Sequence, residues 1–174
     1  PISIERPFEL PTLREGHIVS AAPLFVDATE AVLSVLPFVV RRRVKWGDCD
    51  PAGVVYTGRF SDYVLGAVSL FFRGIAGEPW HDFNRRLDID TPCKALSFEF
   101  QHALWPEEEF DMTVSVAAVR TRSFDLGVVG RRTDGPIAFT ATMSPICIAR
   151  GERRSVAIPA PLLEKLAPHR QNAE

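Results

Sequence analysis

The stretch "WGDCDPAGVVYTGRFSDYVLGAVSLFFRG", residues 46–74, decides the fold. Its second half carries apolar side chains at helical spacing, which are Phe60, Tyr63, Val64, Ala67, Val68 and Phe71. A second stripe, formed by Leu65, Ser69 and Phe72, is also apolar or small. The pattern predicts a long helix that ends near Gly74 and is buried on two sides, against a sheet or at a subunit contact.

Strand-like alternation surrounds this predicted helix. Residues 38–46 precede it, and residues 96–101 and 112–118 follow it, with apolar and polar side chains in turn. Two further strand-like runs, residues 124–132 and 137–150, flank a hairpin turn signal at residues 134–135. The order is strand, long helix and then further strands, which indicates an α+β domain. We therefore expect one antiparallel sheet packed against one buried helix.

The first part of the chain shows no comparable pattern. We interpret residues 1–36 as an N-terminal extension of unknown role, in which residues 25–36 are compatible with a short helix starting near Asp27 or Thr29. Residues 37–168 form the predicted domain, and residues 169–174 form a C-terminal tail.

Composition narrows the possible functions of the 174-residue chain. A net charge of −2 gives no reason to expect a nucleic acid as partner. Three cysteines without metal-type spacing indicate reduced thiols, so we expect a cytoplasmic protein with no bound metal. No apolar run reaches the roughly 20 residues that cross a bilayer, and residues 1–17 lack the order of a signal peptide. We therefore expect no membrane partner.

The loop before the predicted helix contains the strongest candidate for chemistry, Asp50. It precedes Pro51, which favours extended or turn backbone, and Gly53 permits a sharp turn. Thr57 is a plausible N-cap, and the helix N-terminus that follows offers unpaired N–H groups. A carboxylate beside such donors suits acyl transfer, because one group attacks while the others hold the oxyanion. The alternative is that Asp50 only forms an Asx-type turn.

The neighbours of Asp50 are weaker candidates. Asp48 and Asp50 alone make a poor metal site. Cys49 has no nearby histidine to act as its base, so a partly buried thiol is the better interpretation. His102 fits a hydrogen-bonded histidine at a strand end.

A second cluster lies at residues 120–124, "RTRSF". Arg120 and Arg122 can bind phosphate through their guanidinium groups, and Ser123 can do so through its hydroxyl. Two solvated charges at the end of a strand remain the alternative.

Taken together, these motifs resemble the 4-hydroxybenzoyl-CoA thioesterase family, whose hotdog fold wraps an antiparallel sheet around one long helix. The resemblance extends from about Phe38 to Leu166 and includes the spacing between the motifs. The motifs are "WGDCDPAGVVY" (46–56), "EPW" (78–80), "TP" (91–92), "RTRSF" (120–124) and "AIPAPLLEKL" (157–166).

The resemblance implies a role for individual residues. Asp50 matches the catalytic carboxylate, acting as nucleophile or as general base toward water. The backbone N–H at Thr57 matches the oxyanion donor. Arg120, Arg122 and Ser123 match positions that contact the nucleotide phosphates of CoA. The family also implies a homodimer, or a tetramer of two dimers, with sites at the subunit interface.

The acyl pocket is expected to involve Tyr56, Leu65, Trp80 and Pro92. Relatives that act on 4-hydroxybenzoyl groups commonly carry an acid that binds the ring hydroxyl, and Leu65 occupies the matching position. A buried leucine offers that hydroxyl no partner, so an apolar acyl group is expected there. The segment at residues 57–59, Thr-Gly-Arg, also departs from the family pattern.

The resemblance therefore predicts an acyl-CoA thioesterase that acts on a small or medium acyl or aryl group. CoA is then part of the substrate, and no separate cofactor is expected. Two alternatives stay open. One is a thioesterase for acyl groups on acyl carrier protein, for which residues 41–43 or residues 150–154 would supply a basic docking surface. The other is a non-catalytic module that binds acyl-CoA.

Overall fold

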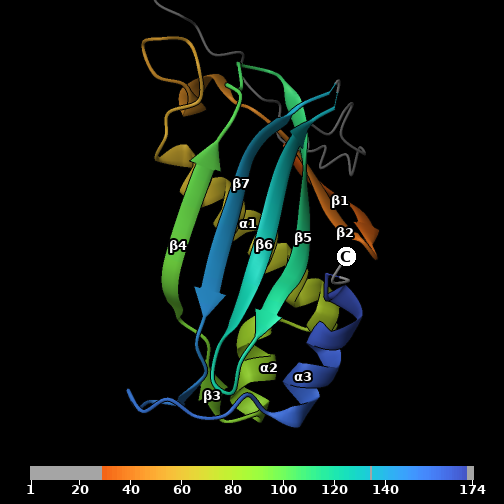
Figure 1. Cartoon of the computed structure of the whole chain (residues 1–174), viewed down its shortest axis with the longest axis vertical. Coiled ribbons are helices and arrows are strands. Elements are labelled where there is room, and N and C mark those ends of the chain that lie inside the picture. The colour runs from red at the N-terminus through yellow and green to blue at the C-terminus, as the bar shows by residue number, and fades with distance from the viewer. Residues whose placement is uncertain (1–28, 134, 172–174) are drawn as a thin grey trace, which may run out of the picture.

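The computed structural model describes residues 29–133 and 135–171, which form one antiparallel sheet with a long helix across one face (Figure 1). The long helix is α1 (Arg59–Ala76). The strand order is β1-β2-β5-β6-β7-β4. These strands are β1 (Glu30–Val35), β2 (Phe38–Arg43), β4 (Cys93–Phe100), β5 (Glu109–Val119), β6 (Phe124–Arg132) and β7 (Ile137–Pro145). The predicted α+β architecture is confirmed.

Short elements complete the domain around the two ends of α1. Strands β3 and β8 pair in a separate small sheet, and α2 follows α1 directly. The bounds are η1 (Trp46–Asp48), α2 (Trp80–Arg86), β3 (Ile89–Asp90), β8 (Ile148–Ala149), α3 (Ala160–Leu166) and η2 (Ala167–His169).

Helix α1 buries its main apolar stripe against the sheet. The buried residues include the whole predicted set, which is Phe60, Tyr63, Val64, Ala67, Val68 and Phe71. The start of the helix differs from the prediction, because the N-cap is Gly58 rather than Thr57 and no side chain caps it. The N-terminus of α1 therefore has no side-chain hydrogen bond that caps it.

The end of α1 also differs from the prediction. The helix passes Gly74 and continues to Ala76, because Ile75 adds a further buried side chain to the stripe. Gly77 then ends it with a φ of 75° and donates its N–H to the carbonyl of Arg73 at 3.0 Å. Among the described residues, no helix has the length and apolar character needed to cross a membrane.

The second stripe of α1 is buried only in part. Phe72 is buried and stacks on Trp80 of α2, with ring centroids 4.1 Å apart. Ser69 is exposed, and Leu65 is 44% exposed. The expectation that Leu65 is buried is therefore wrong for the single chain, because α2 covers only the C-terminal end of this face. Toward its N-terminus, the outer face of α1 is open.

The sheet supplies the other side of the core. In β5, Met112, Val114 and Val116 are buried, as the alternation predicts. In β4 the same alternation leaves Leu96 and Phe98 only partly buried. The difference follows from position, since within residues 29–133 and 135–171 β4 is an edge strand that pairs only with β7.

Strand β1 corrects the short helix predicted within residues 25–36. Asp27 lies outside the described residues, and from Glu30 the chain forms a strand that pairs antiparallel with β2. Glu30 accepts a hydrogen bond from Arg42 at 3.0 Å, which ties the start of β1 to its neighbour. The sheet thus begins inside the segment assigned to an extension. The short apolar run is compatible with a helix or a strand, and its pairing with β2 makes it a strand.

Candidate active site

The loop between η1 and α1 folds back on itself as a tight hairpin. The Asp50 N–H donates to the Val54 carbonyl and the Gly53 N–H donates to the Asp50 carbonyl, both at 2.9 Å. Gly53 has a φ of 80°, a conformation that other residues rarely adopt. The Tyr56 N–H donates to the Asp48 carbonyl at 2.9 Å and closes the hairpin. Asp50 is therefore held beside the segment that leads into α1.

Only one oxygen of the Asp50 carboxylate accepts a hydrogen bond from the described residues. Its Oδ1 accepts the N–H of Ala52 at 2.8 Å, which is the Asx-type turn considered above. No hydrogen bond among the described residues uses its Oδ2. The side chain is partly exposed. The turn therefore orients the group and leaves one oxygen available for chemistry.

Unused backbone donors lie at the start of α1. The Arg59 N–H donates to the Tyr56 carbonyl, and the Phe60 N–H lies 3.3 Å from the Thr57 carbonyl. Within residues 29–133 and 135–171, no hydrogen bond uses the N–H of Thr57 or Gly58. The positive end of the helix dipole lies at the same place. This arrangement can stabilise negative charge on a carbonyl oxygen.

Asp48 fixes the position of the loop. It is 8% exposed, and its Oδ2 accepts the Tyr63 hydroxyl at 2.7 Å and the Lys45 N–H at 3.1 Å. The Arg59 guanidinium lies 3.8 Å from its Oδ1. Burial, together with the hydrogen bond to Asp48, raises the pKa of Tyr63, so the phenol stays neutral and donates. Asp48, the last residue of η1, thus connects the loop to Lys45 before it and to α1 after it.

Tyr63 is a residue that sequence reasoning missed. It belonged to the apolar stripe of α1 and was counted only as core. The available signal was chemical, because it carries the one hydroxyl in that buried stripe. Buried tyrosine hydroxyls usually find a hydrogen-bond partner, and Asp48 is the acid held nearest to it.

Cys49 does not have the environment of a nucleophile. Burial raises the pKa of its thiol, and the negative charges of Asp48 and Asp50 raise it further. A thiol that keeps its proton is a poor nucleophile. In the part of the chain that the structure describes, no three His, Cys, Asp or Glu side chains gather as a metal site would require.

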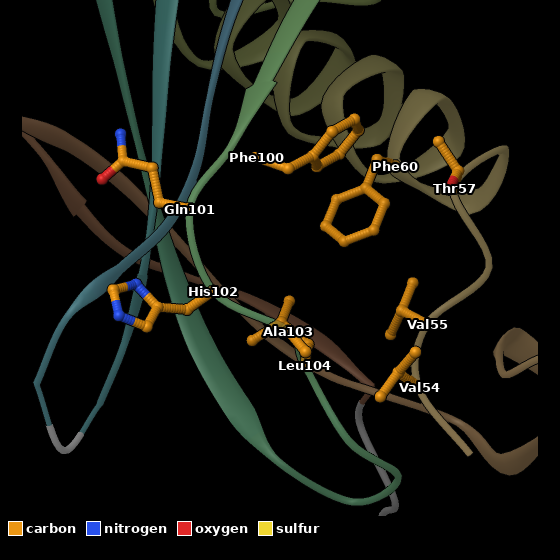
Figure 2. Close-up of a pocket in the computed structure, with 9 residues that line it drawn as sticks. All are labelled: Val54, Val55, Thr57, Phe60, Phe100, Gln101, His102, Ala103 and Leu104. Atoms are coloured by element: carbon orange, nitrogen blue, oxygen red, sulfur yellow. The ribbon is translucent and has the colours of Figure 1, made fainter. Parts of the chain in front are cut away.

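An apolar pocket opens beside the start of α1 (Figure 2). Its volume is about 330 Å³. It lies between the loop, the first turn of α1 and the segment that follows β4. The lining residues are Val54, Val55, Thr57, Phe60, Phe100, Gln101, His102, Ala103 and Leu104. Apart from Thr57, sequence reasoning assigned none of these residues to a site, because three separate segments form the pocket.

The basic cluster joins β5 to β6 at the opposite end of the sheet. Figure 1 shows this turn near α2 and α3, whereas α1 begins at the other end. Arg120 forms a bidentate ion pair with Asp125, in which Nη1 donates to Oδ1 at 2.9 Å and Nη2 donates to Oδ2 at 2.6 Å. This pair lowers the pKa of the Asp125 carboxyl. Arg122 is exposed and contacts Ser155 at 3.2 Å. Ser123 is buried. Within one chain, this cluster and Asp50 are apart.

The predicted acyl-pocket residues fall into two groups. Tyr56 is 58% exposed and Leu65 is open on the outer face of α1. Trp80 lies at the far end of α1, where its Nε1–H donates to Thr91 at 2.9 Å, and Pro92 is exposed nearby. The single chain does not bring the four residues together in one pocket.

Comparison with known proteins identifies the family to which the chain belongs. A family profile described as the thioesterase-like superfamily matches residues 44–166, from the end of β2 to the end of α3. No protein with a curated description matches the chain significantly in sequence.

Several solved structures share the fold. A thioesterase superfamily protein from Jannaschia sp. CCS1 is 25% identical, with a TM-score of 0.71 over 78% of this chain and 94% of that chain. The 4-hydroxybenzoyl-CoA thioesterase of Pseudomonas sp. strain CBS-3 is 22% identical, with a TM-score of 0.66 over 73% and 96%. The 1,4-dihydroxy-2-naphthoyl-CoA thioesterase of Synechocystis is 19% identical, with a TM-score of 0.68 over 75% and 95%. The predicted hotdog fold and family resemblance are confirmed.

Proposed function

Since this chain belongs to the thioesterase-like superfamily, we propose that it hydrolyses an acyl-CoA thioester, releasing CoA and the free acid of a small or medium acyl or aryl group. The observation that carries the proposal is the pair of unused N–H groups at Thr57 and Gly58, beside the hairpin that holds Asp50. A carboxylate with a free oxygen next to oxyanion donors supplies both parts of an acyl-transfer site.

In the proposed reaction, the thioester carbonyl oxygen lies against the Thr57 N–H. Either Asp50 attacks the carbonyl carbon, or it removes a proton from the water molecule that attacks. The carbon–sulfur bond then breaks, and CoA leaves as the thiolate and takes up a proton. If Asp50 attacked, the acyl group is now joined to it as an anhydride, and a water molecule hydrolyses this bond to release the free acid and restore the carboxylate. Negative charge on the carbonyl oxygen grows during the attack, so donors that face it lower the barrier more than they tighten substrate binding.

We propose that the site is completed in a homodimer. In the described part of the chain, strand β4 presents an unpaired edge, and Leu65 on α1 is exposed. Edge strands of this kind readily pair with a second copy. Antiparallel pairing through β4 reverses one subunit relative to the other, so the Arg122 end of one sheet approaches the start of α1 in the other. Two such dimers would form the tetramer.

The role of Asp50 is tested by Asp50→Asn in an assay of CoA release. The loss of a nucleophile or general base is expected to lower kcat by about 100-fold or more, with little change in KM. Asp88→Asn is the matched control, since Asp88 is exposed in a turn beyond α2 and its left-handed backbone also suits asparagine. Near-full turnover by Asp50→Asn would refute the assignment.

The role of the basic cluster is tested by the double variant Arg120→Ala and Arg122→Ala. These side chains are remote from the reacting carbon, so the variant is expected to raise KM more than it lowers kcat. Increased salt should reduce the difference from the wild type, because it screens contacts between exposed charges. An unchanged KM for CoA esters would show that the phosphates bind elsewhere.

A further inference from the structure

We infer that the pocket beside the start of α1 binds the acyl group, and that this group is an apolar one of limited size, such as a single aromatic ring or a short aliphatic chain. The inference rests on the proposed hydrolysis of acyl-CoA and specifies its substrate class.

The position of the pocket supports this assignment. Thr57, whose N–H is the proposed oxyanion donor, is one of its lining residues. Val54, whose carbonyl accepts the Asp50 N–H, is another. A thioester carbonyl at Thr57 therefore has the pocket directly beside it. The acyl group is the part of the substrate attached to that carbonyl.

The chemistry of the lining selects an apolar group. The side chains that surround the space in Figure 2 are mainly those of Val54, Val55, Phe60, Phe100 and Leu104. Of the three polar lining residues, Gln101 and His102 point their side chains away from it, which leaves Thr57 as the third.

The imidazole of His102 is already engaged outside the pocket, where its Nδ1–H donates to the carbonyl of Ile137 at 2.8 Å. Among the residues that the structure describes, no Asp, Glu, Lys or Arg lines the space. A hydroxyl or carboxylate placed there would lose its hydration, with the Thr57 hydroxyl as the one remaining side-chain partner among the lining residues.

The volume limits the size of the group. An apolar cavity of about 150 Å³ holds a benzene molecule, and this pocket has about 330 Å³. It therefore has room for one aromatic ring with a few further carbon atoms. Long acyl chains would extend beyond its walls.

The two aromatic side chains that line the pocket differ in how deeply they are buried. The Phe60 ring is buried and packs edge-to-face on Phe139, with centroids 5.0 Å apart. Phe100 also packs edge-to-face on Phe60, with ring centroids 4.8 Å apart, but it is 48% exposed. Phe100 can therefore be replaced without opening the core, which makes it the position of choice for changing the width of the pocket.

The test measures kcat/KM for CoA release from benzoyl-, 4-hydroxybenzoyl-, succinyl- and dodecanoyl-CoA. The wild type is expected to prefer benzoyl-CoA over each of the others by about tenfold or more. Phe100→Ala should raise the ratio of dodecanoyl- to benzoyl-CoA turnover, because it widens the pocket. Ala103→Leu should lower that ratio, because it fills the pocket.

Phe98→Ala is the matched control. Phe98 lies on the same face of β4 and stacks on Phe100, but it does not line the pocket. It should leave the substrate ratio unchanged, whatever its effect on assembly. A preference for the hydroxylated or charged ester, or an equal shift with Phe98→Ala and Phe100→Ala, would overturn the pocket assignment while leaving the thioesterase proposal intact. Absence of CoA release from every ester would overturn the thioesterase proposal, and the pocket assignment with it.

Discussion

Replacing Tyr63 by phenylalanine tests whether the bond to Asp48 holds the catalytic loop in place. The substitution removes only the hydroxyl, which donates to Asp48 Oδ2 at 2.7 Å, and leaves the buried ring in the core. A hydrogen bond to a charged group contributes about 1.5–3 kcal/mol. In a protein of this size that corresponds to a fall in Tm of about 3–12 °C. The Asp48 carboxylate would keep the Lys45 N–H as its donor.

Thermal unfolding should be followed by calorimetry at one protein concentration, since assembly makes Tm depend on concentration. Tyr56→Phe is the matched control. The Tyr56 side chain is exposed, and no hydrogen bond of the described residues uses its hydroxyl. The same preparations should show slower CoA release for Tyr63→Phe, because the loop that carries Asp50 is less tightly held. If the two tyrosine variants lost Tm equally, the bond to Asp48 would have no special role.

Two further predictions concern the sheet. A methyl group added by Gly130→Ala would overlap the buried Phe139 ring, so this variant should lose about 1–3 kcal/mol of unfolding free energy in urea titrations. Gly127→Ala in the same strand meets only ordinary contacts and should lose less, so equal losses would contradict the argument. The hydrogen bond from Arg120 holds the pKa of Asp125 in the folded protein below its usual value. The ion pair therefore stabilises the fold at pH values above the pKa of Asp125 in the unfolded chain, and this stabilisation is lost as the pH falls through the lower pKa of the folded protein. Tm curves from about pH 6 to pH 3 should therefore show Asp125→Asn approaching the wild type at the acid end, and a constant gap would count against the pairing.

The central helix could be predicted because its information is local. Six apolar side chains at helical spacing specify one face, and all six are buried. The end of the helix was less predictable, since Gly74 and Gly77 are both plausible stop signals. Only the packing of Ile75 decides between them.

Strand β1 could not be predicted, because the six residues Glu30–Val35 fit a helix turn as well as a strand. Its pairing with β2, which follows it directly in the sequence, settles the state. Leu65 illustrates the opposite case. Its apolar character led to the expectation of a buried side chain, but nothing in the spacing showed that the single chain leaves this face of α1 open.

The candidate site was predictable where one segment forms it and not where several meet. Asp50 and Thr57 belong to one loop, so one continuous motif was enough to single out both residues. Their roles stay predictions. The ion pair between Arg120 and Asp125 joins residues on either side of a turn, so reading the arginine alone suggested a free cation. The pocket brings Phe60 and Phe100 together from elements that are adjacent only in the folded chain.

The packing of Phe60 has a consequence for protein engineering. Its ring contacts Phe139 and Tyr63 in the core and also forms a wall of the pocket. Every substitution at Phe60 therefore changes folding and ligand fit at the same time. Phe100 and Ala103 line the same space from the other side with less buried contact. A library intended to change the range of accepted acyl groups should vary these two positions, where fit can be altered while the core keeps its shape.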